Sequence, residues 1–261
     1  MKNFLTAFLI SLLFTLNVNA GTDAANSISK KSPNNVKDCF ENINRVTFKF
    51  NQFLDGAIIE PIAKAYRTLP SPIRSGTSNV LDNISSLITI PNNILQGEIE
   101  TAGVNTARLI VNTTVGVVGI FDVAKKIGFR EYEKEDYGQT LGTMGVGPGC
   151  YLVLPVIGPS TARDTAGSFI NVLGGDPWYN ASVNGNNEYL GKSQYAATKV
   201  LTGLDFRAKN IDSIENLEKN SIDFYASVKS LYLQNRRQNI LNRNSTLEII
   251  YDGDWEEIES Q

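Results

Sequence analysis

Apolar side chains recur every three or four residues along most of this chain, and no other feature limits its possible folds as strongly. The spacing is clearest in the series Phe40, Ile43, Val46, Phe50 and Phe53. It returns over residues 80–88, 104–115 and 211–232. Such spacing places apolar residues on one face of an amphipathic helix. Alternation typical of strands is scarce, since the apolar run Tyr151–Leu154 ends at Pro155. We therefore predict an all-α fold with few or no strands.

Prolines and glycines predict where these helices begin and end. Pro61 suits the first turn of a short helix, and Pro70 stops it. The helical pattern after residue 80 is expected to end at Pro91, with a further short run to Gly97 as a C-cap. Near the C-terminus we expect two helices, with Ser221 as the N-cap of the second.

The composition excludes several classes of function. The chain has 261 residues, no histidine and two cysteines. Ser-His-Asp or Cys-His catalysis and His-based zinc chemistry are therefore impossible, and two thiols alone cannot complete a four-cysteine metal site. The sequence shows no G-x-S-x-G motif and no nucleophile paired with a base. We expect no enzyme, no metal and no cofactor. The net charge of −3 also argues against a nucleic-acid partner.

The two ends of the chain differ from the segment between them. Residues 1–20 have a positive start, an apolar run and small residues before Gly21, which predicts a secretory signal peptide, with a signal anchor as the alternative. Residues 21–36 are small and polar and predict a disordered leader. Residues 244–261 form an acidic tail that we expect to be disordered. The helical domain is then residues 37–243.

The segment Leu109–Ala124 carries a single charge, Asp122. As one helix it would be about 24 Å long, short of the roughly 30 Å hydrocarbon core of a bilayer. Gly116 and Gly119 permit a bend or a close approach between backbones. Two interpretations stay open at this point: a segment that dips into one leaflet, and a buried core helix.

Polar residues lie inside or beside these apolar stretches. Asn44 and Arg45, then Arg108 and Asn112, then the pair Arg163-Asp164 follow this pattern. An arginine on a membrane-facing helix is costly unless it is paired or lines a wet cavity. The residues are therefore either snorkelling or structurally paired side chains, or the lining of a polar channel inside an apolar shell.

Nine ordered motifs over roughly residues 38–241 resemble the MlaA (VacJ) family of bacterial outer-membrane lipoproteins. The motifs are Phe40–Asp55, Pro61–Arg67, Pro72–Asn79, Asn93–Gly97, Arg108–Ala124, Asp136–Gly147, Leu154-Pro155, Gly158–Ser160 and Arg163-Asp164.

The resemblance implies a ring-like arrangement of amphipathic helices with a central channel, embedded in the periplasmic leaflet of the outer membrane. Such a protein removes mislocalised phospholipid from the outer leaflet, catalyses no reaction, and hands the lipid to a periplasmic carrier of the MlaC type. A trimeric porin is a further implied partner. The alternative is a structural or surface envelope protein needed for cell-to-cell spreading, without transport.

On this resemblance we expect seven polar residues at or near the channel and three glycines in a mobile gate. The channel residues are Asn44, Arg45, Asn51, Arg108, Asn112, Arg163 and Asp164, and the gate residues are Gly142, Gly145 and Gly147. Arg236 and Arg237 on the last helix are expected either to contact the carrier or porin or to lie on a solvated face.

The chain departs from the family pattern in its cysteines. The family usually begins its mature chain with an acylated cysteine, whereas here the predicted cut has none beside it. Attachment to the membrane would then depend on the embedded helices. Cys39 and Cys150 stand where the family commonly has proline, and a pair of cysteines in an exported chain suggests a disulfide. Two free thiols are the alternative.

Overall fold

The computed structural model describes residues 36–185 and 191–241. The predicted signal peptide (1–20), all but the last residue of the leader (21–36) and the acidic tail (244–261) lie outside the described residues. Helices make up most of the described chain, and its strands form one two-stranded antiparallel sheet. The prediction of an all-α fold with few strands is confirmed.

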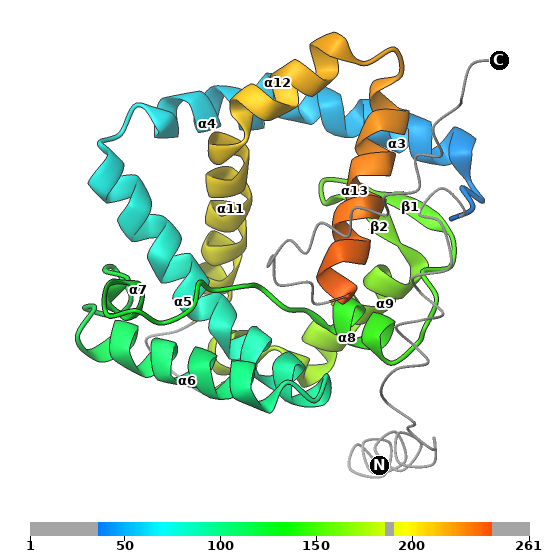
Figure 1. The fold of residues 1–261 in the computed structure, drawn as a ribbon. Coiled ribbons are helices and arrows are strands. Elements are labelled where there is room, and N and C mark those ends of the chain that lie inside the picture. Colours follow the sequence, from blue (N-terminus) through cyan, green and yellow to red (C-terminus); the bar gives the residue numbers. More distant parts are fainter. Residues whose placement is uncertain (1–35, 186–190, 242–261) are drawn as a thin grey trace, which may run out of the picture.

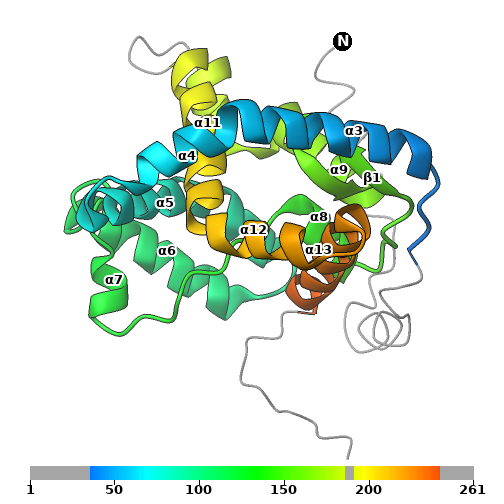
Figure 2. The same cartoon turned by 90° about the horizontal axis from the view of Figure 1, so that it is seen from above.

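A long helical rod occupies one edge of the molecule (Figures 1 and 2). It consists of α3 (Glu41–Leu54), the π-helical segment η2 (Asp55–Ile59) and α4 (Glu60–Arg67), which follow one another without a break. Pro61 does lie in the first turn of α4. Pro61 lacks the N–H that would continue the backbone hydrogen bonds, and it follows directly after the π-helical turn, where the regular α-helical bonding is already interrupted, so the rod continues through it.

Helices α5 (Ser71–Leu95) and α6 (Ile99–Thr114) form a second, closely packed pair. Gly97, with a φ of 83°, ends the first of them as predicted. The expected end at Pro91 is wrong, because α5 continues through it to Leu95. A proline costs one backbone hydrogen bond and some crowding, and packing against α6 over the last turns of α5 offsets that cost.

The segment 109–124 is not one helix, which corrects the interpretation as a buried core helix, whereas a dip into one leaflet stays a prediction. Helix α6 ends at Thr114, and the chain turns back through residues 115–121 before α7 (Val123–Lys126). The turn requires left-handed backbone at Val117 (φ 52°) and Val118 (φ 57°). Within the described ranges, no helix is both long and apolar enough to cross a membrane.

Short elements follow before the last three helices. They are α8 (Tyr137–Thr143), β1 (Tyr151–Leu154), β2 (Gly158–Thr161), α9 (Ala162–Ile170), η3 (Asn171–Gly175), α10 (Pro177–Tyr179) and η4 (Asn180–Asn184). In the sheet, Tyr151 pairs with Thr161 and Leu154 with Gly158.

The last three helices are α11 (Lys192–Lys209), α12 (Ile211–Asn220) and α13 (Phe224–Ile240). The predicted break near Ser221 is confirmed, but its N-cap residue is wrong. The side chain that caps α13 is Asp223, whose carboxylate accepts from the Ala226 amide. An aspartate is as good an N-cap as a serine and adds a negative charge near the positive helix end.

The helices follow the edges of an open frame instead of stacking in layers (Figure 1). The rod and α12 form one edge, α5 and α6 the opposite one, and α13 with α8 and α9 a third, while α11 runs between the first two edges. This outline is compatible with a ring. A channel through it stays a prediction, because side chains fill part of the space between ribbons.

The hydrophobic core is small and divided. Its larger cluster joins α3, β1 and α13 and consists of Phe48, Tyr151, Val153, Tyr225 and Leu233. A disulfide between Cys39 and Cys150 ties the start of α3 to β1 beside this cluster, with 5.6 Å between the Cα atoms. Elsewhere in the described chain, buried polar and charged side chains outnumber buried hydrophobic ones.

Candidate functional site

The apolar stripe of the first predicted helix faces outward. Phe40, Ile43, Val46, Phe50 and Phe53 share one face of the rod, as the spacing predicts, yet all are exposed. Val46 and Phe53 keep about 70% of their surface accessible (69% and 70%). Only Phe48, from another face of α3, enters the core. A stripe of this size on the outside indicates contact with a partner or a membrane.

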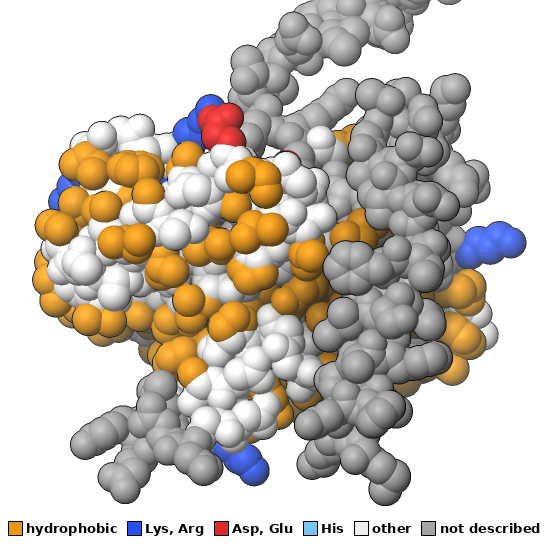
Figure 3. All heavy atoms as spheres, turned by 90° about the horizontal axis from the view of Figure 1, so that it is seen from below, with side chains coloured by type: hydrophobic (Ala, Val, Ile, Leu, Met, Phe, Trp, Pro, Cys, Tyr) orange, Lys and Arg blue, Asp and Glu red, His pale blue; other side chains and the backbone are white. Residues whose placement is uncertain are grey.

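The opposite edge carries a second apolar surface. Seen from below, hydrophobic side chains cover much of the surface, and the charged ones in view lie at its margins (Figure 3). The exposed residues of α6 and the turn after it are Ile99, Ile110, Val115, Val117, Val118, Ile120 and Phe121. Valine rarely adopts a positive φ, so Val117 and Val118 hold a strained turn that leaves their side chains exposed.

The inner side of α5 is polar. Buried amides and hydroxyls follow its length, namely Ser78, Asn83, Ser86, Thr89, Asn92 and Asn93. Partners from other elements satisfy many of them. The Asn105 side-chain amide donates to the side-chain oxygen of Asn93 (2.9 Å), and the Thr140 hydroxyl donates to the side-chain oxygen of Asn92 (2.6 Å). Leu81 and Ile88 are buried as well, so the buried face of α5 is mixed but mostly polar, whereas a water-soluble helix usually buries a mainly apolar face.

Two predicted channel residues, Arg108 and Asn112, meet at Asp122. The Arg108 guanidinium donates to both Asp122 oxygens (3.0 and 2.8 Å) and to the Arg130 carbonyl (2.7 Å). The Asn112 amide donates to the same carboxylate (3.0 Å). Burial alone would raise the pKa of Asp122, but the Lys125 amide, Asn112 and Arg108 hold it below its ordinary value.

A polar recess of about 30 Å³ adjoins this ion pair. It is lined by Asn79, Asp82, Asn83, Ser86, Arg108, Asn112, Asp122 and Tyr132. Its volume suits about one water molecule. Asp82 lines this recess and is also exposed to solvent.

Asp82 and Lys134 are the charged groups of this region that sequence reasoning missed. Solvent reaches both side chains, yet surrounding protein removes part of their hydration, which raises the pKa of Asp82 and lowers that of Lys134. The charges that act on Lys134 come from Lys199 on α11, Asp136 at the start of α8, Asp82 on α5 and Asp176 at the start of α10.

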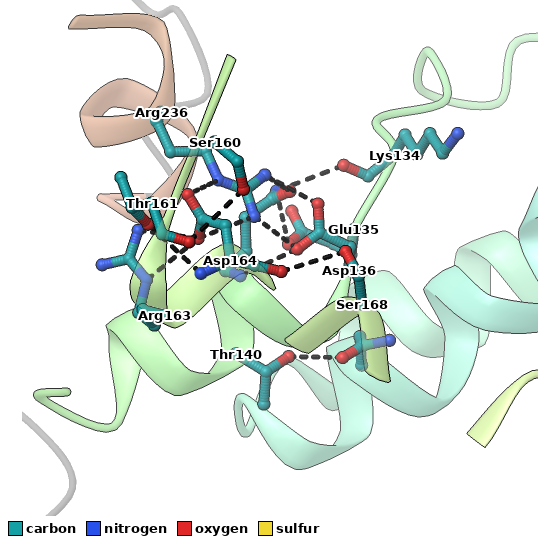
Figure 4. A network of polar contacts seen from close by, with 12 residues as sticks. Lys134, Glu135, Asp136, Thr140, Ser160, Thr161, Arg163, Asp164, Ser168 and Arg236 are labelled. Carbon is teal, nitrogen blue, oxygen red and sulfur yellow. Dashed lines mark hydrogen bonds and ion pairs between the residues drawn. The ribbon is translucent and has the colours of Figure 1, made fainter. Parts of the chain in front are cut away.

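The predicted pair Arg163-Asp164 is structural. Asp164 accepts from Arg163 (3.0 Å), the Tyr232 hydroxyl (2.6 Å) and Arg236 (3.1 Å), and Arg236 continues to Asp136 (2.6 Å). Figure 4 shows Asp136 at the start of α8, Arg163 and Asp164 of α9, and Arg236 of α13 converging on one another. Burial would raise the pKa of Asp164, but Arg236 and Arg163 keep it below its ordinary value. The Arg236 side chain keeps 14% of its surface exposed, so it does not lie on a solvated face, and contact of this helix with a carrier or porin stays a prediction.

Glu135 lies beside that network. It accepts from Gln96 (2.9 Å) and Gln139 (2.8 Å), and burial raises the pKa of this carboxyl to about 7 despite both hydrogen bonds. The protonated carboxyl is thus well populated at neutral pH.

Asn44, Asn51 and Arg45 lie on the core side of the rod. The amide of Asn44 bonds the Tyr151 carbonyl and the Val153 N–H, and that of Asn51 bonds the Leu154 carbonyl. Together they clamp β1 to α3. Arg45 pairs with Glu41 and Asp223 and borders a cavity of about 260 Å³ between α3 and α13. These three predicted channel residues hold elements together, away from α5.

The three predicted gate glycines have different surroundings. Gly142 belongs to α8 and is packed so closely that a Cβ would lie 2.8 Å from Ile240. Gly145 has a φ of 89° in the turn after α8, and nothing lies within 4 Å of a Cβ at Gly147. Close packing explains why position 142 is a glycine, and the positive φ explains why position 145 is one. Movement of this segment stays a prediction.

The polar stripe of α5 had a signal in the sequence. Ser78, Asp82, Ser86, Thr89 and Asn93 recur at steps of four, four, three and four, which is helical spacing for polar residues. Lys134 had no such signal in the sequence, because its position depends on how the connection before α8 crosses the frame. Within the described ranges no group of three or more carboxylate or thiol side chains is placed to hold a metal ion.

Comparisons with known proteins place this arrangement in a family. Residues 36–239 match the family model MlaA lipoprotein. The chain is 33% identical over 201 residues to the Escherichia coli (strain K12) protein named Intermembrane phospholipid transport system lipoprotein MlaA, covering 76% of both. It is 32% identical over 207 residues to a protein of Rickettsia bellii (strain RML369-C), covering 78% of this chain and 77% of that one.

A solved structure from work described as “Structural basis for maintenance of bacterial outer membrane lipid asymmetry” matches with a TM-score of 0.68 and 32% identity. The match covers 78% of this chain and 99% of that one. The family model covers most of the described helices, and each of the two relatives covers more than three quarters of the chain. This chain therefore belongs to the MlaA lipoprotein family.

Proposed function

We propose that this protein carries phospholipids at the bacterial outer membrane, removing them from the outer leaflet and passing them to a soluble periplasmic carrier, without catalysing a reaction. The observation that carries the proposal is the inverted polarity of the frame. Its outer edges expose the apolar stripes of α3 and α6, while α5 buries a polar face. Supporting it, a relative is named as a component of an intermembrane phospholipid transport system.

The physical requirement for such transport is a hydrated path for a charged headgroup. Moving a phosphate through hydrocarbon without partners costs several kcal/mol or more. A wall of amides, hydroxyls and a few charges lowers that cost, and apolar outer stripes allow the acyl chains and the protein to share one leaflet. Asp82 lines the recess beside α5, and both Asp82 and Lys134 are exposed to solvent.

The strained turn 115–121 fits a shallow position in one leaflet. It places Val117, Val118 and Phe121 outside with over half of each side chain exposed. Because the helices in the described ranges are too short or too polar to span a bilayer, we infer that these apolar surfaces enter the periplasmic leaflet only. A porin and a carrier of the MlaC type are the partners we propose.

The test measures phospholipid at the cell surface. Bacteria that lack this chain should expose more phospholipid to an added phospholipase, and the intact chain should restore the low level. The double variant Asp82→Leu/Lys134→Leu should not restore it, because it replaces both accessible charges of the inner wall. Lys126→Leu, an exposed charge on α7, is the matched control. Equal surface phospholipid with and without the chain would overturn the proposal.

A further inference from the structure

The cavity of about 260 Å³ between α3 and α13 combines apolar walls with two cations. Its apolar lining comes from Val36, Tyr225, Ala226 and Leu233, and its polar lining from Glu41, Arg45, Lys229 and Ser230. The volume lies below the roughly 300–1,000 Å³ of pockets that bind small molecules. The cavity is therefore too small for a phospholipid, and it suits one or two protein side chains.

One face of α13 lines this cavity. Ala226, Lys229, Ser230 and Leu233 recur at helical spacing, so they share that face. The helix ends at Ile240, and the chain beyond residue 241 leaves from the same end. At a rise of ~1.5 Å per residue, the cavity begins only about 12 Å back along the helix from that point.

The acidic tail holds one apolar stretch. Leu247, Ile249, Ile250 and Tyr251 are followed by acidic residues up to Glu259. Composition favours disorder for the tail as a whole, but such a stretch gains free energy when an apolar cavity buries it. Residues 21–35, which lead into the cavity at Val36, hold a single large apolar side chain, Ile28. The tail is therefore the better occupant of the two.

The length of the chain beyond α13 fits this occupant. Residues 242–245 read Asn-Arg-Asn-Ser, and asparagine and serine favour turns. After a reversal there, an extended chain advances ~3.3 Å per residue. Residues 249–251 then come about 10–17 Å back along α13, level with Leu233 and Ser230. Asp254 comes about 26 Å back, level with Tyr225.

We propose that residues 247–254 bind back into the cavity between α3 and α13 of the same chain. The apolar side chains of residues 249–251 fill its apolar part, and Asp252 and Asp254 extend toward its two cations. Because the tail is tethered, its effective concentration at the cavity is on the order of millimolar, so a weak contact suffices. This inference does not rest on the proposed function.

The two cations can accept these additional partners. The Arg45 guanidinium lies 4.4 Å from the centroid of the Tyr225 ring and pairs with Glu41 and Asp223. Those contacts use three of its five donors within the described chain. Lys229 donates to Asp38 there, which uses one of its three donors.

The experiment places the photo-cross-linker p-benzoylphenylalanine at position 251 of the full-length purified protein in detergent. Mass spectrometry then maps the cross-linked peptides. The links should concentrate in residues 36–45 and 225–233, which line the cavity. The same probe at position 260, beyond the docked segment, is the matched control and should link to these residues about fivefold less.

Variants test the cavity and the charges separately. Ser230→Trp fills the cavity and should lower the yield of the links from position 251 about fivefold, whereas Ser230→Ala should keep it. Asp252→Asn combined with Asp254→Asn should lower the yield about two- to fourfold, because exposed ion pairs contribute little.

Three results would overturn the inference. The first is a set of links from position 251 that spreads over the chain like those from position 260 or maps to another surface. The second is a mixture of heavy-isotope and ordinary protein in which links join only different copies, which would assign the cavity to the tail of a second copy. The third is an unchanged yield in Ser230→Trp with a thermal unfolding curve like that of the intact protein.

Discussion

Two sides of the frame are held together by different kinds of interaction. On the side of α3, the sheet and α13, aromatic and aliphatic residues pack into a core and a disulfide closes a loop across 111 positions. On the side of α5 and α6, buried amides, hydroxyls and the Arg108–Asp122 ion pair join the elements beside a few buried apolar residues. A helix pair that keeps a polar inner surface and an apolar outer surface has few apolar residues left for a core, so hydrogen bonds and ion pairs hold it together.

The largest expected effect breaks the covalent brace of the α3 side. Cys39→Ser with Cys150→Ser removes a cross-link over 111 positions, which loop-closure entropy values at about 4–5 kcal/mol. The free energy of unfolding in detergent, measured with denaturant, should fall by that amount. Mass spectrometry of the natively purified protein with and without reductant is the control, and two free thiols before reduction would contradict the bond.

The next effect tests the α6 side. Arg108→Leu leaves the Asp122 carboxylate without its guanidinium in a buried site, and breaking a buried pair costs about 3–5 kcal/mol of unfolding free energy. Arg130→Gln, which breaks the exposed pair with Glu100, should cost less than about 1 kcal/mol. Equal losses of unfolding free energy in the two variants would show that the Arg108–Asp122 pair stabilises the fold no more than the exposed pair does.

A third effect appears as pH dependence near α8. Folding raises the pKa of Glu135 from an ordinary 4.5 to about 7, so its contribution to stability is full below pH 4.5 and is lost as the pH rises through 7. The unfolding free energy should therefore fall by up to roughly 3 kcal/mol from this group between acid and pH 8. Glu135→Gln should flatten that part of the profile, and an unchanged profile would contradict the assignment.

The smallest effect on stability, and the sharpest contrast, concerns the outer face. Val46→Gln on the exposed stripe of α3 should change the unfolding free energy in detergent by no more than about 0.5 kcal/mol. Association with lipid vesicles should weaken measurably, because an apolar anchor becomes polar. A marked loss of stability with unchanged vesicle association would show that the stripe is a packing surface.

The sequence predicted the helices better than their surroundings. The apolar spacing of Ile43 and Val46 indicates one face of a helix, but periodicity is the same whether that face meets a core or a lipid. Sequence position could not show that Arg163 shares Asp164 with Arg236, because α13 brings the second guanidinium from 73 positions along the chain. The turn at Val117 was unpredictable for a related reason, since valine rarely adopts a positive φ.

Labelling of single introduced cysteines tests the inverted polarity most directly. Asp82→Cys and Ile110→Cys are each placed in the full-length chain in membranes, where the native cysteines are bonded to each other. The account predicts that a water-soluble, membrane-impermeant maleimide labels position 82 quickly and position 110 slowly. A fluorophore at position 110 should be quenched by a lipid-borne quencher. Protection at position 82 together with rapid labelling at position 110 would contradict a polar path inside an apolar shell.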